Sequence, residues 1–426
     1  MCKFPVGCIP EKTRVLMVGG SNCRGVTLIV SNFEVTVEKL VYGGDGLARL
    51  DGRVVFAPFV LPGERILARA EQEKPGMVRA RMLEVREAAP DRVAAPCPVY
   101  GRCGGCHYQH APYEYQLVAK RAILVEALQR LGKIVPPEDI AVVAAEPFGY
   151  RNRVQLHVEE KRLGYREARS HKLCAVTECP VGSPKINQAI AALAKMQRDW
   201  RWPRFIKSLE VFTDEREVQV NVLETDRPVA RRFFDWCGAQ IPGLVEGALD
   251  YRGEFRVSSN SFFQVNRLLI DRLVEAAIEG AEGETAIDLY AGVGLLSIPL
   301  ARRFREVTAV ESGAGAVRDL QFNAARAGLE NLHAMPQTAE EHLARLEKAP
   351  DFVVLDPPRT GLGKAVVGRL TELRPRQITI VACDPATLAR DLAALVAARY
   401  RVERMTLVDL FPQTYHLETV VRLKLE

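Results

Sequence analysis

The thiol of Cys383 stands where a nucleophile could act. The apolar, β-branched residues 378–382 before it predict a strand, and Asp-Pro-Ala-Thr (384–387) after it is typical of the first turn of a helix. In open parallel sheets, ligands bind at the carboxyl ends of the strands. A helix N-terminus also lowers the pKa of a nearby thiol. Most isolated cysteines are small buried hydrophobes, but position and context favour a nucleophile here.

A glycine turn between a predicted strand and a predicted helix forms a second candidate site. In Asp-Leu-Tyr-Ala-Gly-Val-Gly (288–294), Gly292 and Gly294 would let the backbone approach a ligand closely beside Tyr290. Glu311 ends the next predicted strand about 20 residues on, which suits the two hydroxyl groups of an adenosine ribose. The turn lacks a Gly-Lys-Ser/Thr ending, which disfavours a phosphate-cradling loop. The pattern favours S-adenosylmethionine slightly over NAD; an ordinary strand–helix turn is the alternative.

Two further carboxylates lie beside predicted strands. Asp356 ends the strand predicted for 352–355, and the two prolines of Asp-Pro-Pro-Arg (356–359) would hold the following loop rigid. Glu418, in His-Leu-Glu-Thr (416–419), opens a final strand and could act as a general base. Taken singly, Asp356 is compatible with a plain strand-exit turn and Glu418 with a surface carboxylate, so each gains weight only in combination with the other motifs.

Cysteines cluster in one stretch of the chain. The sequence has ten cysteines, and Cys97, Cys103 and Cys106 lie close together in a Pro/Gly-rich region, with Cys174 and Cys179 further on. Such an arrangement predicts a four-cysteine metal site, and the pattern alone leaves zinc and an iron–sulfur cluster open. The spacing is not the Cys-x3-Cys-x2-Cys of radical S-adenosylmethionine enzymes, which disfavours a redox or radical enzyme.

Composition places the chain among ordinary globular proteins. Its 426 residues suffice for two or three domains, 48% of them are hydrophobic and 26% charged, and the net charge is +5. This mild excess permits a nucleic-acid partner without requiring one. No apolar run reaches the roughly 18 residues of a membrane helix, and the first residues lack a signal-peptide pattern. We therefore expect a cytoplasmic protein without membrane contact, and nothing demands more than a monomer.

The predicted elements divide the chain into segments. Five short strands between 34 and 90 predict a small barrel of the OB type, a common oligonucleotide platform. Residues 91–255 look mixed, with an irregular stretch, a helix and several strands. From about 256, apolar strand candidates alternate with helices, which is the βαβ pattern of a doubly wound, mostly parallel sheet. We expect an α/β fold, and residues 1–33 have no assigned role.

Five motifs occur together and in a fixed order: Phe-Gln-Val-Asn (263–266), the glycine turn (288–294), Asp-Pro-Pro-Arg (356–359), Cys-Asp-Pro-Ala-Thr (383–387) and His-Leu-Glu-Thr (416–419). In this the chain resembles the RNA uridine-5-methyltransferases over about residues 34–426, and more closely their ribosomal-RNA branch, which carries an iron–sulfur cluster. The resemblance implies a TRAM barrel (34–90), a central RNA-binding domain with the cluster (91–255) and a Rossmann-like methyltransferase domain (256–426). The expected substrate is then 23S ribosomal RNA, with transfer RNA as the alternative.

The resemblance also implies a role for each motif. The thiolate of Cys383 would add to carbon 6 of the uracil and make carbon 5 nucleophilic toward the methyl group, and Glu418 would then remove the carbon 5 proton. The cofactor S-adenosylmethionine would contact Gln264, Tyr290, Gly292, Gly294, Glu311 and Asp356. A [4Fe–4S] cluster would be held by Cys97, Cys103, Cys106 and Cys179, with Cys174 as a rival fourth ligand.

The chain departs from the family pattern at two positions. Leu295 stands where many relatives have asparagine after the glycine turn, and Asp384 stands where they often have asparagine after the cysteine. A carboxylate at 384 would oppose thiolate formation slightly. A further cofactor contact after the third strand falls on Gln337 or Thr338.

The target atom lies on a base that is normally stacked, so the enzyme must take an exposed loop base or flip one out. For contacts to the structured RNA we expect Arg151 and Asn152, which suit phosphates or base edges, and Phe263 at the border of the pocket. A strand with solvated arginines is the alternative for 150–153. From a different class, the chain could be a catalytically silent iron–sulfur RNA-binding or ribosome assembly factor, against which the intact Cys383 and Glu418 argue.

Overall fold

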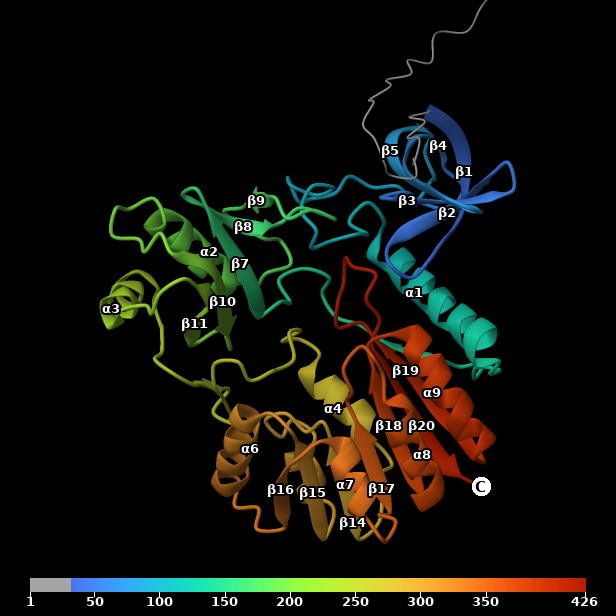
Figure 1. Cartoon of the computed structure of the whole chain (residues 1–426), viewed down its shortest axis with the longest axis vertical. Helices are drawn as coiled ribbons and strands as arrows, with labels where there is room; N and C mark the ends of the chain where they lie inside the picture. The colour runs from blue at the N-terminus through green and yellow to red at the C-terminus, as the bar shows by residue number, and fades with distance from the viewer. Residues whose placement is uncertain (1–31) are drawn as a thin grey trace, which may run out of the picture. The chain divides into compact units, whose positions relative to one another are not determined.

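The computed structural model describes residues 32–426, so all but the last two positions of the extension at 1–33 lie outside the described residues. The chain separates into two compact units, Met1–Arg92 and Val93–Glu426. The first contains a barrel, and the second contains a five-stranded antiparallel sheet and an eight-stranded mixed sheet (Figure 1). Among residues 32–426, no helix combines the length and the apolar character needed to cross a bilayer.

Alternating apolar and polar residues build the barrel of the first unit. Along β1, Val35 and Val37 are buried and their neighbours face outward, and a bulge after Val37 shifts the alternation so that Leu40 is buried as well. The strands close in the order β1-β2-β3-β5-β4, which confirms the predicted barrel. The strands are β1 (Asn32–Leu40), β2 (Asp45–Leu50), β3 (Arg53–Pro58), β4 (Arg65–Lys74) and β5 (Met77–Glu87).

The antiparallel sheet of the second unit has the order β11-β10-β7-β8-β9. Helix α2 contributes Ile186, Ile190 and Leu193 to the apolar core beside this sheet, because these residues recur at helical spacing. Ser183 caps α2 by accepting a hydrogen bond from the Ile186 N–H. The elements are β7 (Arg153–Glu159), β8 (Arg162–Arg166), β9 (Leu173–Ala175), α2 (Pro184–Met196), β10 (Ile206–Thr213), β11 (Val218–Thr225) and α3 (Arg231–Gln240), followed by the hairpin β12 (Leu249–Tyr251) and β13 (Phe255–Val257).

The mixed sheet has the order β16-β15-β14-β17-β18-β20-β19-β6. Its strands β14 to β18 run parallel, and β20 runs antiparallel to both of its neighbours. This confirms the predicted Rossmann-like sheet, although the sequence analysis missed β6 and β16. The strands are β6 (Ala141–Val143), β14 (Thr285–Leu289), β15 (Glu306–Glu311), β16 (Leu332–Pro336), β17 (Phe352–Leu355), β18 (Gln377–Ala382), β19 (Tyr400–Val408) and β20 (Thr419–Leu425).

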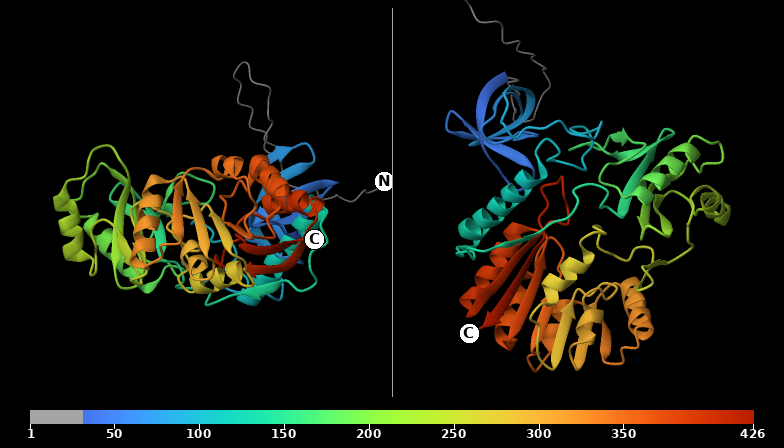
Figure 2. Two further views of the ribbon diagram at one scale, coloured as in Figure 1. Left: turned by 90° about the horizontal axis from the view of Figure 1, so that it is seen from below. Right: turned by 180° about the vertical axis from the view of Figure 1, so that it is seen from behind.

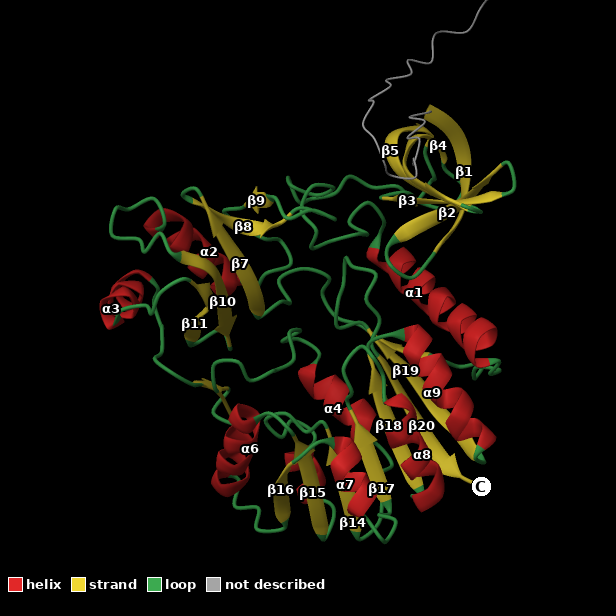
Figure 3. Ribbon diagram, in the orientation of Figure 1, coloured by secondary structure: helices red, strands yellow, loops and turns green. Residues whose placement is uncertain are grey.

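Helices connect these strands, as Figures 2 and 3 show from different sides. Helix α9 begins at Pro385, as predicted, with Asp384 as its N-cap. Helix α1 is unusual because its buried residues include the polar Gln116 and Lys120. The helices are α1 (Tyr113–Ala127), continued by the π-turn η1 (Leu128–Gly132), then α4 (Ile270–Ile278), α5 (Ser297–Ala301), α6 (Ala314–Arg326), α7 (Ala339–Arg345), α8 (Gly363–Leu373) and α9 (Pro385–Ala397).

Candidate active site

Strand pairing brings Cys383 and Glu418 to the same edge of the mixed sheet. Ala382, the last residue of β18, pairs with Thr419, the first residue of β20. Cys383 follows the first and Glu418 precedes the second, so the antiparallel register places them side by side. On the other side of β18, Leu355 pairs with Ile380 and is followed by Asp356. A thiol and two carboxyl groups therefore converge at the carboxyl end of the parallel strands.

The environment of Cys383 opposes ionisation of its thiol in the empty enzyme. Burial, with the nearby Glu418 and Asp356, raises the pKa of Cys383 to about 12, although Arg359 and a backbone hydrogen bond of Cys383 itself act in the opposite direction. The prediction that the helix N-terminus lowers this pKa is therefore wrong. The physical reason includes Asp384, whose carboxylate accepts the first free N–H groups of α9, from Ala386 at 3.0 Å and from residue 387 at 2.9 Å. Those donors are not available to a thiolate.

Desolvation by burial raises the pKa of three carboxyl groups around this edge. Desolvation raises the pKa of Asp288 to about 7, although Ser297 donates a hydrogen bond to it at 2.5 Å. Desolvation in the enclosed pocket raises the pKa of Asp356 to about 7 as well, although solvent reaches its edge. Glu418 is buried, its pKa is raised well above the ordinary value, and its Oε1 atom has no hydrogen-bond partner. A ligand with positive charge would favour the ionised form of all three.

A cavity of about 40 Å³ is lined by Asp288 and Asp356 but not by Glu418 or Cys383, and several of the expected cofactor contacts line it. This volume is below the 300–1,000 Å³ typical of ligand pockets, so side chains must move apart when a ligand enters. The amide of Gln264 donates to Asp356 at 3.3 Å, which joins two of the lining residues. The lining includes Phe262, Phe263, Gln264, Asp288, Tyr290, Gly292, Leu295, Asp356 and Val381.

Two of the expected cofactor residues shape the glycine turn instead of lining the cavity. The carboxylate of Glu311 accepts the N–H of Gly292 at 2.9 Å and that of Gly313 at 2.6 Å. Gly294 has a φ of +97°, and a Cβ there would meet Leu320 Cδ1 at 2.6 Å, so this position requires glycine for packing. Gln337 and Thr338 were the two alternatives for a further cofactor contact. The side chain of Gln337 bonds to His342 and that of Thr338 caps α7, so both bond within their own segment.

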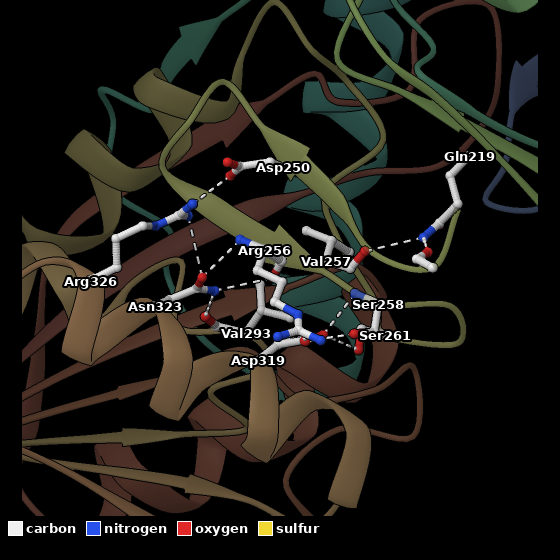
Figure 4. Close-up of polar contacts among 11 residues, drawn as sticks. Gln219, Asp250, Arg256, Val257, Ser258, Ser261, Val293, Asp319, Asn323 and Arg326 are labelled. Carbon is white, nitrogen blue, oxygen red and sulfur yellow. Dashed lines mark hydrogen bonds and ion pairs between the residues drawn. The ribbon is translucent and has the colours of Figure 1, made fainter. Parts of the chain in front are cut away.

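Figure 4 shows a network, missed by the sequence analysis, that ties the segment before Gln264 to helix α6. Asp319 accepts hydrogen bonds from the Ser258 N–H and hydroxyl and from the Ser261 hydroxyl, at 2.7 to 2.8 Å. Asn323 pairs with both backbone groups of Arg256 and also donates to the carbonyl of residue 293. These buried bonds hold the segment that carries the pocket residues 262–264.

Two of the expected RNA contacts have structural roles. The Asn152 side chain is fully buried and donates to Tyr251 Oη and to the Gln264 carbonyl, so it positions the pocket segment. The Phe263 ring is 2% exposed and packs against Tyr251 in an aromatic cluster, whereas Phe262 is 62% exposed. Residues Asn152 and Phe263 are therefore corrected from RNA contacts to supporting residues, because local sequence does not show which way a side chain points.

Arg151 keeps an accessible part that could still meet RNA. It is half-buried, and its Nε donates to the Arg153 carbonyl at 2.9 Å. Arg153 is buried, lies over the Phe212 ring at 4.2 Å and donates to the carbonyl of Ser261. The prediction of solvated arginines along 150–153 therefore fails at Arg153.

Four cysteines line a cavity of about 160 Å³ in the second unit, namely Cys97, Cys103, Cys106 and Cys179. Cys174 is buried, does not line this cavity and accepts a hydrogen bond from Arg102 Nε at 3.3 Å. Burial raises the pKa of Cys103 to about 11 and that of Cys106 to about 12, and their mutual repulsion adds to this. In the described part of the chain, no group of three or more His, Cys, Asp or Glu side chains that could hold a metal ion is found.

Comparison with known proteins agrees with this architecture. The family model tRNA (Uracil-5-)-methyltransferase matches residues 248–426, and the TRAM domain model matches residues 27–83. An uncharacterised RNA methyltransferase of Aquifex aeolicus is 33% identical, covering 92% of this chain and 98% of that protein. One from Streptomyces avermitilis is 35% identical with the same coverage. The crystal structure of Pyrococcus abyssi tRNA (uracil-54, C5)-methyltransferase in complex with S-adenosyl-L-homocysteine has a TM-score of 0.73 and 26% identity, covering 91% of this chain and 99% of that one.

The chain therefore belongs to the RNA methyltransferases; its residues 248–426 form a tRNA (uracil-5-)-methyltransferase family domain, and a TRAM domain precedes them in the sequence. This confirms the resemblance drawn from the five motifs and the expectation of an RNA (uracil-5-)-methyltransferase.

Proposed function

We propose that this enzyme methylates carbon 5 of a uridine in structured RNA through a temporary bond between Cys383 and carbon 6 of the base. The observation that carries the proposal is the convergence of Cys383, Glu418 and Asp356 at one sheet edge, where Asp356 also lines the cavity of the glycine turn. S-adenosylmethionine, when bound, supplies an electrophilic methyl group and a positive charge. That charge would offset the two carboxylates that raise the pKa of Cys383.

Each of these residues then has a separate role in the reaction. The Cys383 sulfur, as the thiolate, forms a bond to carbon 6, and the electron pair of the ring double bond becomes available for carbon 5 to take the methyl group. The bond between that methyl group and the sulfonium sulfur would break with its electron pair left on the sulfur, and S-adenosylhomocysteine would be the leaving group. Glu418, ionised in the loaded site, accepts the proton from the methylated carbon 5. The electrons of that C–H bond re-form the ring double bond, the bond between sulfur and carbon 6 breaks, and the thiolate leaves. The cofactor would be held in the cavity by Gln264, Tyr290, Gly292 and Asp356. Glu311 would bind the ribose hydroxyl groups after its hydrogen bond to the glycine turn breaks.

Cys383 and Glu418 can be tested separately. Cys383→Ala should abolish turnover and also the covalent adduct with RNA that contains 5-fluorouridine, detected as a slower band on a denaturing gel. Glu418→Gln should form the adduct with ordinary RNA and accumulate it, because proton removal stalls. Methyl transfer by Cys383→Ala would disprove the covalent route, and an unchanged rate in Glu418→Gln would remove that residue from the mechanism.

For the substrate we propose 23S ribosomal RNA, because the barrel and the clustered cysteines together resemble the ribosomal-RNA branch of the family. Transfer RNA is the second candidate, because the Pyrococcus abyssi relative that matches 91% of this chain is a tRNA (uracil-54, C5)-methyltransferase. Mapping 5-methyluridine in both RNAs from a deletion strain and its complemented parent decides between them. Loss from ribosomal RNA alone supports the first candidate, and loss from transfer RNA alone supports the second. We further propose that the segments 34–90 and 91–255, including Arg151, contact the RNA, and that the enzyme is a cytoplasmic monomer.

We propose that Cys97, Cys103, Cys106 and Cys179 would hold a [4Fe–4S] cluster, because these four cysteines line one cavity. Its iron would favour four thiolates that otherwise repel each other. Purification without oxygen should yield a brown protein with broad visible absorption, and Cys179→Ser should lose that absorption whereas Cys174→Ser should retain it. The reverse result would make Cys174 the fourth ligand.

A further inference from the structure

Helix α1 holds the loop at residues 409–418, although no residue of this helix is among the reacting groups. The loop leads from β19 into β20 and ends at Glu418. Lys120 Nζ donates to Asp409 Oδ1 at 2.6 Å and to the Phe411 carbonyl at 2.9 Å. Tyr113 Oη donates to the other oxygen of Asp409 at 2.8 Å. Lys120 is 0% exposed and Asp409 is buried, so this ion pair is shielded from solvent and from salt screening.

A buried amide pair makes the second connection between α1 and the loop. Gln116 Nε2 donates to Gln413 Oε1 at 3.0 Å, and Gln116 Oε1 accepts the Gln413 N–H at 3.0 Å. The same Nε2 lies 3.1 Å from the Tyr108 carbonyl and 3.0 Å from the Ala111 carbonyl. Tyr113, Gln116 and Lys120 are three and four residues apart, so they share one face of the helix. This polar stripe explains why α1 buries residues that helices normally expose.

The segment after Cys106 contacts the same loop. The carbonyl of Gln413 accepts the N–H groups of His107 at 2.8 Å and of Tyr108 at 3.0 Å. The His107 ring meets the Tyr415 ring edge-on at 4.6 Å, and Tyr415 lies 4.2 Å from the His416 ring. Gln413 adopts a φ of +67°, a conformation that non-glycine residues rarely keep without such fixing contacts. The four-cysteine segment and the loop that carries Glu418 are thus joined directly.

We propose that Tyr113, Gln116 and Lys120 are positioning residues that fix the location of the Glu418 carboxyl group. Since Glu418 Oε1 has no hydrogen-bond partner of its own, the carboxyl group takes its place from the backbone on either side. One side is β20 and the other is the loop that α1 holds. This inference rests on the proposed function, because it concerns the step in which Glu418 removes the carbon 5 proton.

The test uses the full-length enzyme and the variant Gln116→Met, which keeps the length of the side chain and removes its hydrogen bonds. The expected result is a fall in kcat of about 10²-fold, the size known for misplaced catalytic groups, with KM for RNA little changed. Substrate with deuterium at carbon 5 of the uridine should show a larger kinetic isotope effect than with wild type, because proton removal becomes rate-limiting. The loop at 409–418 should also exchange its amide hydrogens faster.

Gln377→Met is the matched control. Gln377 is another buried glutamine, and it donates to the Gly280 carbonyl at 3.1 Å and accepts the Glu282 N–H at 3.2 Å, at the opposite end of β18. Its loss should lower stability without changing the isotope effect or the exchange of the loop. If Gln116→Met does not fold, Tyr113→Phe, which removes the hydroxyl that bonds to Asp409 and to the Ala145 backbone, should show the same changes at smaller size.

Two outcomes separate this inference from the proposed function. A wild-type isotope effect and wild-type loop exchange in Gln116→Met, or in Tyr113→Phe if that variant has to be used, would overturn the positioning role while leaving the covalent mechanism intact. If the wild-type enzyme forms no adduct with 5-fluorouridine RNA, the mechanism itself fails, whatever the α1 variants do.

A separate observation points to an RNA contact on the loop between α2 and β10. Trp200 is 88% exposed there, although large aromatic side chains are seldom so exposed. Arg198 and Arg204 are exposed and have no acidic partner within the described structure, whereas Arg201 pairs with Asp199. An exposed aromatic ring between unpaired cations is the combination that binds single-stranded nucleic acid, with the ring against a base and the cations against phosphates.

We infer that Trp200 stacks on an unpaired base of the RNA substrate, outside the target nucleotide. Trp200→Ala should weaken binding of the natural RNA about 10-fold and leave kcat at saturating RNA unchanged, while Trp200→Phe should restore most of the affinity. Arg204→Gln should reduce the salt dependence of log K by about one unit of slope. Equal affinity of Trp200→Ala and wild type across salt concentrations would overturn the inference.

Discussion

Two buried polar regions of the second unit differ in whether their carboxyl groups have hydrogen-bond or ion-pair partners. At the end of β14 and just before β20, Asp288 Oδ1 and Glu418 Oε1 lack hydrogen-bond partners, and both side chains have raised pKa values. In the loop that leads to Glu418, Asp409 binds Lys120 with one oxygen and Tyr113 with the other. The fully paired region holds the backbone in place, whereas the incompletely paired region is ready for a cationic ligand.

The difference predicts opposite effects of removing a carboxylate and removing a cation. Glu418→Gln should lower kcat about 10²–10⁴-fold, as expected for loss of a general base. It should not lower stability. Because the pKa of Glu418 in the folded state is raised, its ionisation costs stability as pH rises above the pKa of the unfolded chain, and glutamine removes that cost. Denaturant unfolding at pH 8 checks this, and a clear loss of stability would show that the carboxylate is paired after all.

Lys120→Met should lose stability strongly, in addition to the fall in kcat expected when the Glu418 carboxyl group is misplaced. Breaking a buried pair by removing one partner costs about 3–5 kcal/mol, because the other charge stays buried without compensation. The double variant Lys120→Met with Asp409→Asn should recover part of the loss, since it removes the stranded charge. Urea unfolding midpoints of the three proteins test this. Equal stability of the single and double variants would mean that Asp409 finds another partner.

The comparison also shows what the sequence could and could not predict. Cys383 and Asp356 were predictable because each follows an apolar strand directly, and parallel strands end at one edge. The contacts of Gln116 with Gln413 and of Lys120 with Asp409 join residues almost 300 positions apart, and no local pattern indicates such pairs. For the same reason the sequence does not show that Phe263 points inward and Phe262 outward.

Short strands were missed for a related reason. Strand β6 has only three residues, Ala141–Val143, and its place at the sheet edge comes from pairing with β19. Strand β16, Leu332–Pro336, includes a histidine and a proline and has no β-branched residue. Both owe their conformation to a neighbouring strand that lies elsewhere in the sequence, so tertiary pairing outweighs local propensity there.

The incompletely paired carboxyl groups should make cofactor affinity depend on pH. Asp288 and Asp356 have pKa values of about 7 in the empty pocket. Below pH 7 they are protonated, so a sulfonium ligand must displace protons, and its affinity should fall up to about tenfold per pH unit for each coupled group. Above pH 7 the affinity should level off. S-adenosylhomocysteine, which lacks the sulfonium charge, is the control, and calorimetry from pH 5.5 to 8.5 should show a weaker dependence for it. A constant affinity ratio would contradict the electrostatic role.

The smallest expected effect concerns Asp384, the N-cap residue of α9, which directly follows Cys383. Its carboxylate accepts two N–H groups at the start of α9, next to the Cys383 thiol. Asp384→Asn keeps a good N-cap, since asparagine and aspartate cap helices about equally well, and removes one negative charge near the sulfur. The pKa of Cys383 should fall, and alkylation of the thiol at pH 8 should become faster by about threefold or less, as suits a change of charge at a helix end. Stability should change by a few tenths of a kcal/mol at most.

Cys237, buried in α3 and remote in sequence from this helix, serves as the internal control for alkylation. If the Asp384→Asn thiol reacts no faster, the carboxylate at 384 acts only as a cap, and the raised pKa of Cys383 rests on burial with Glu418 and Asp356 alone.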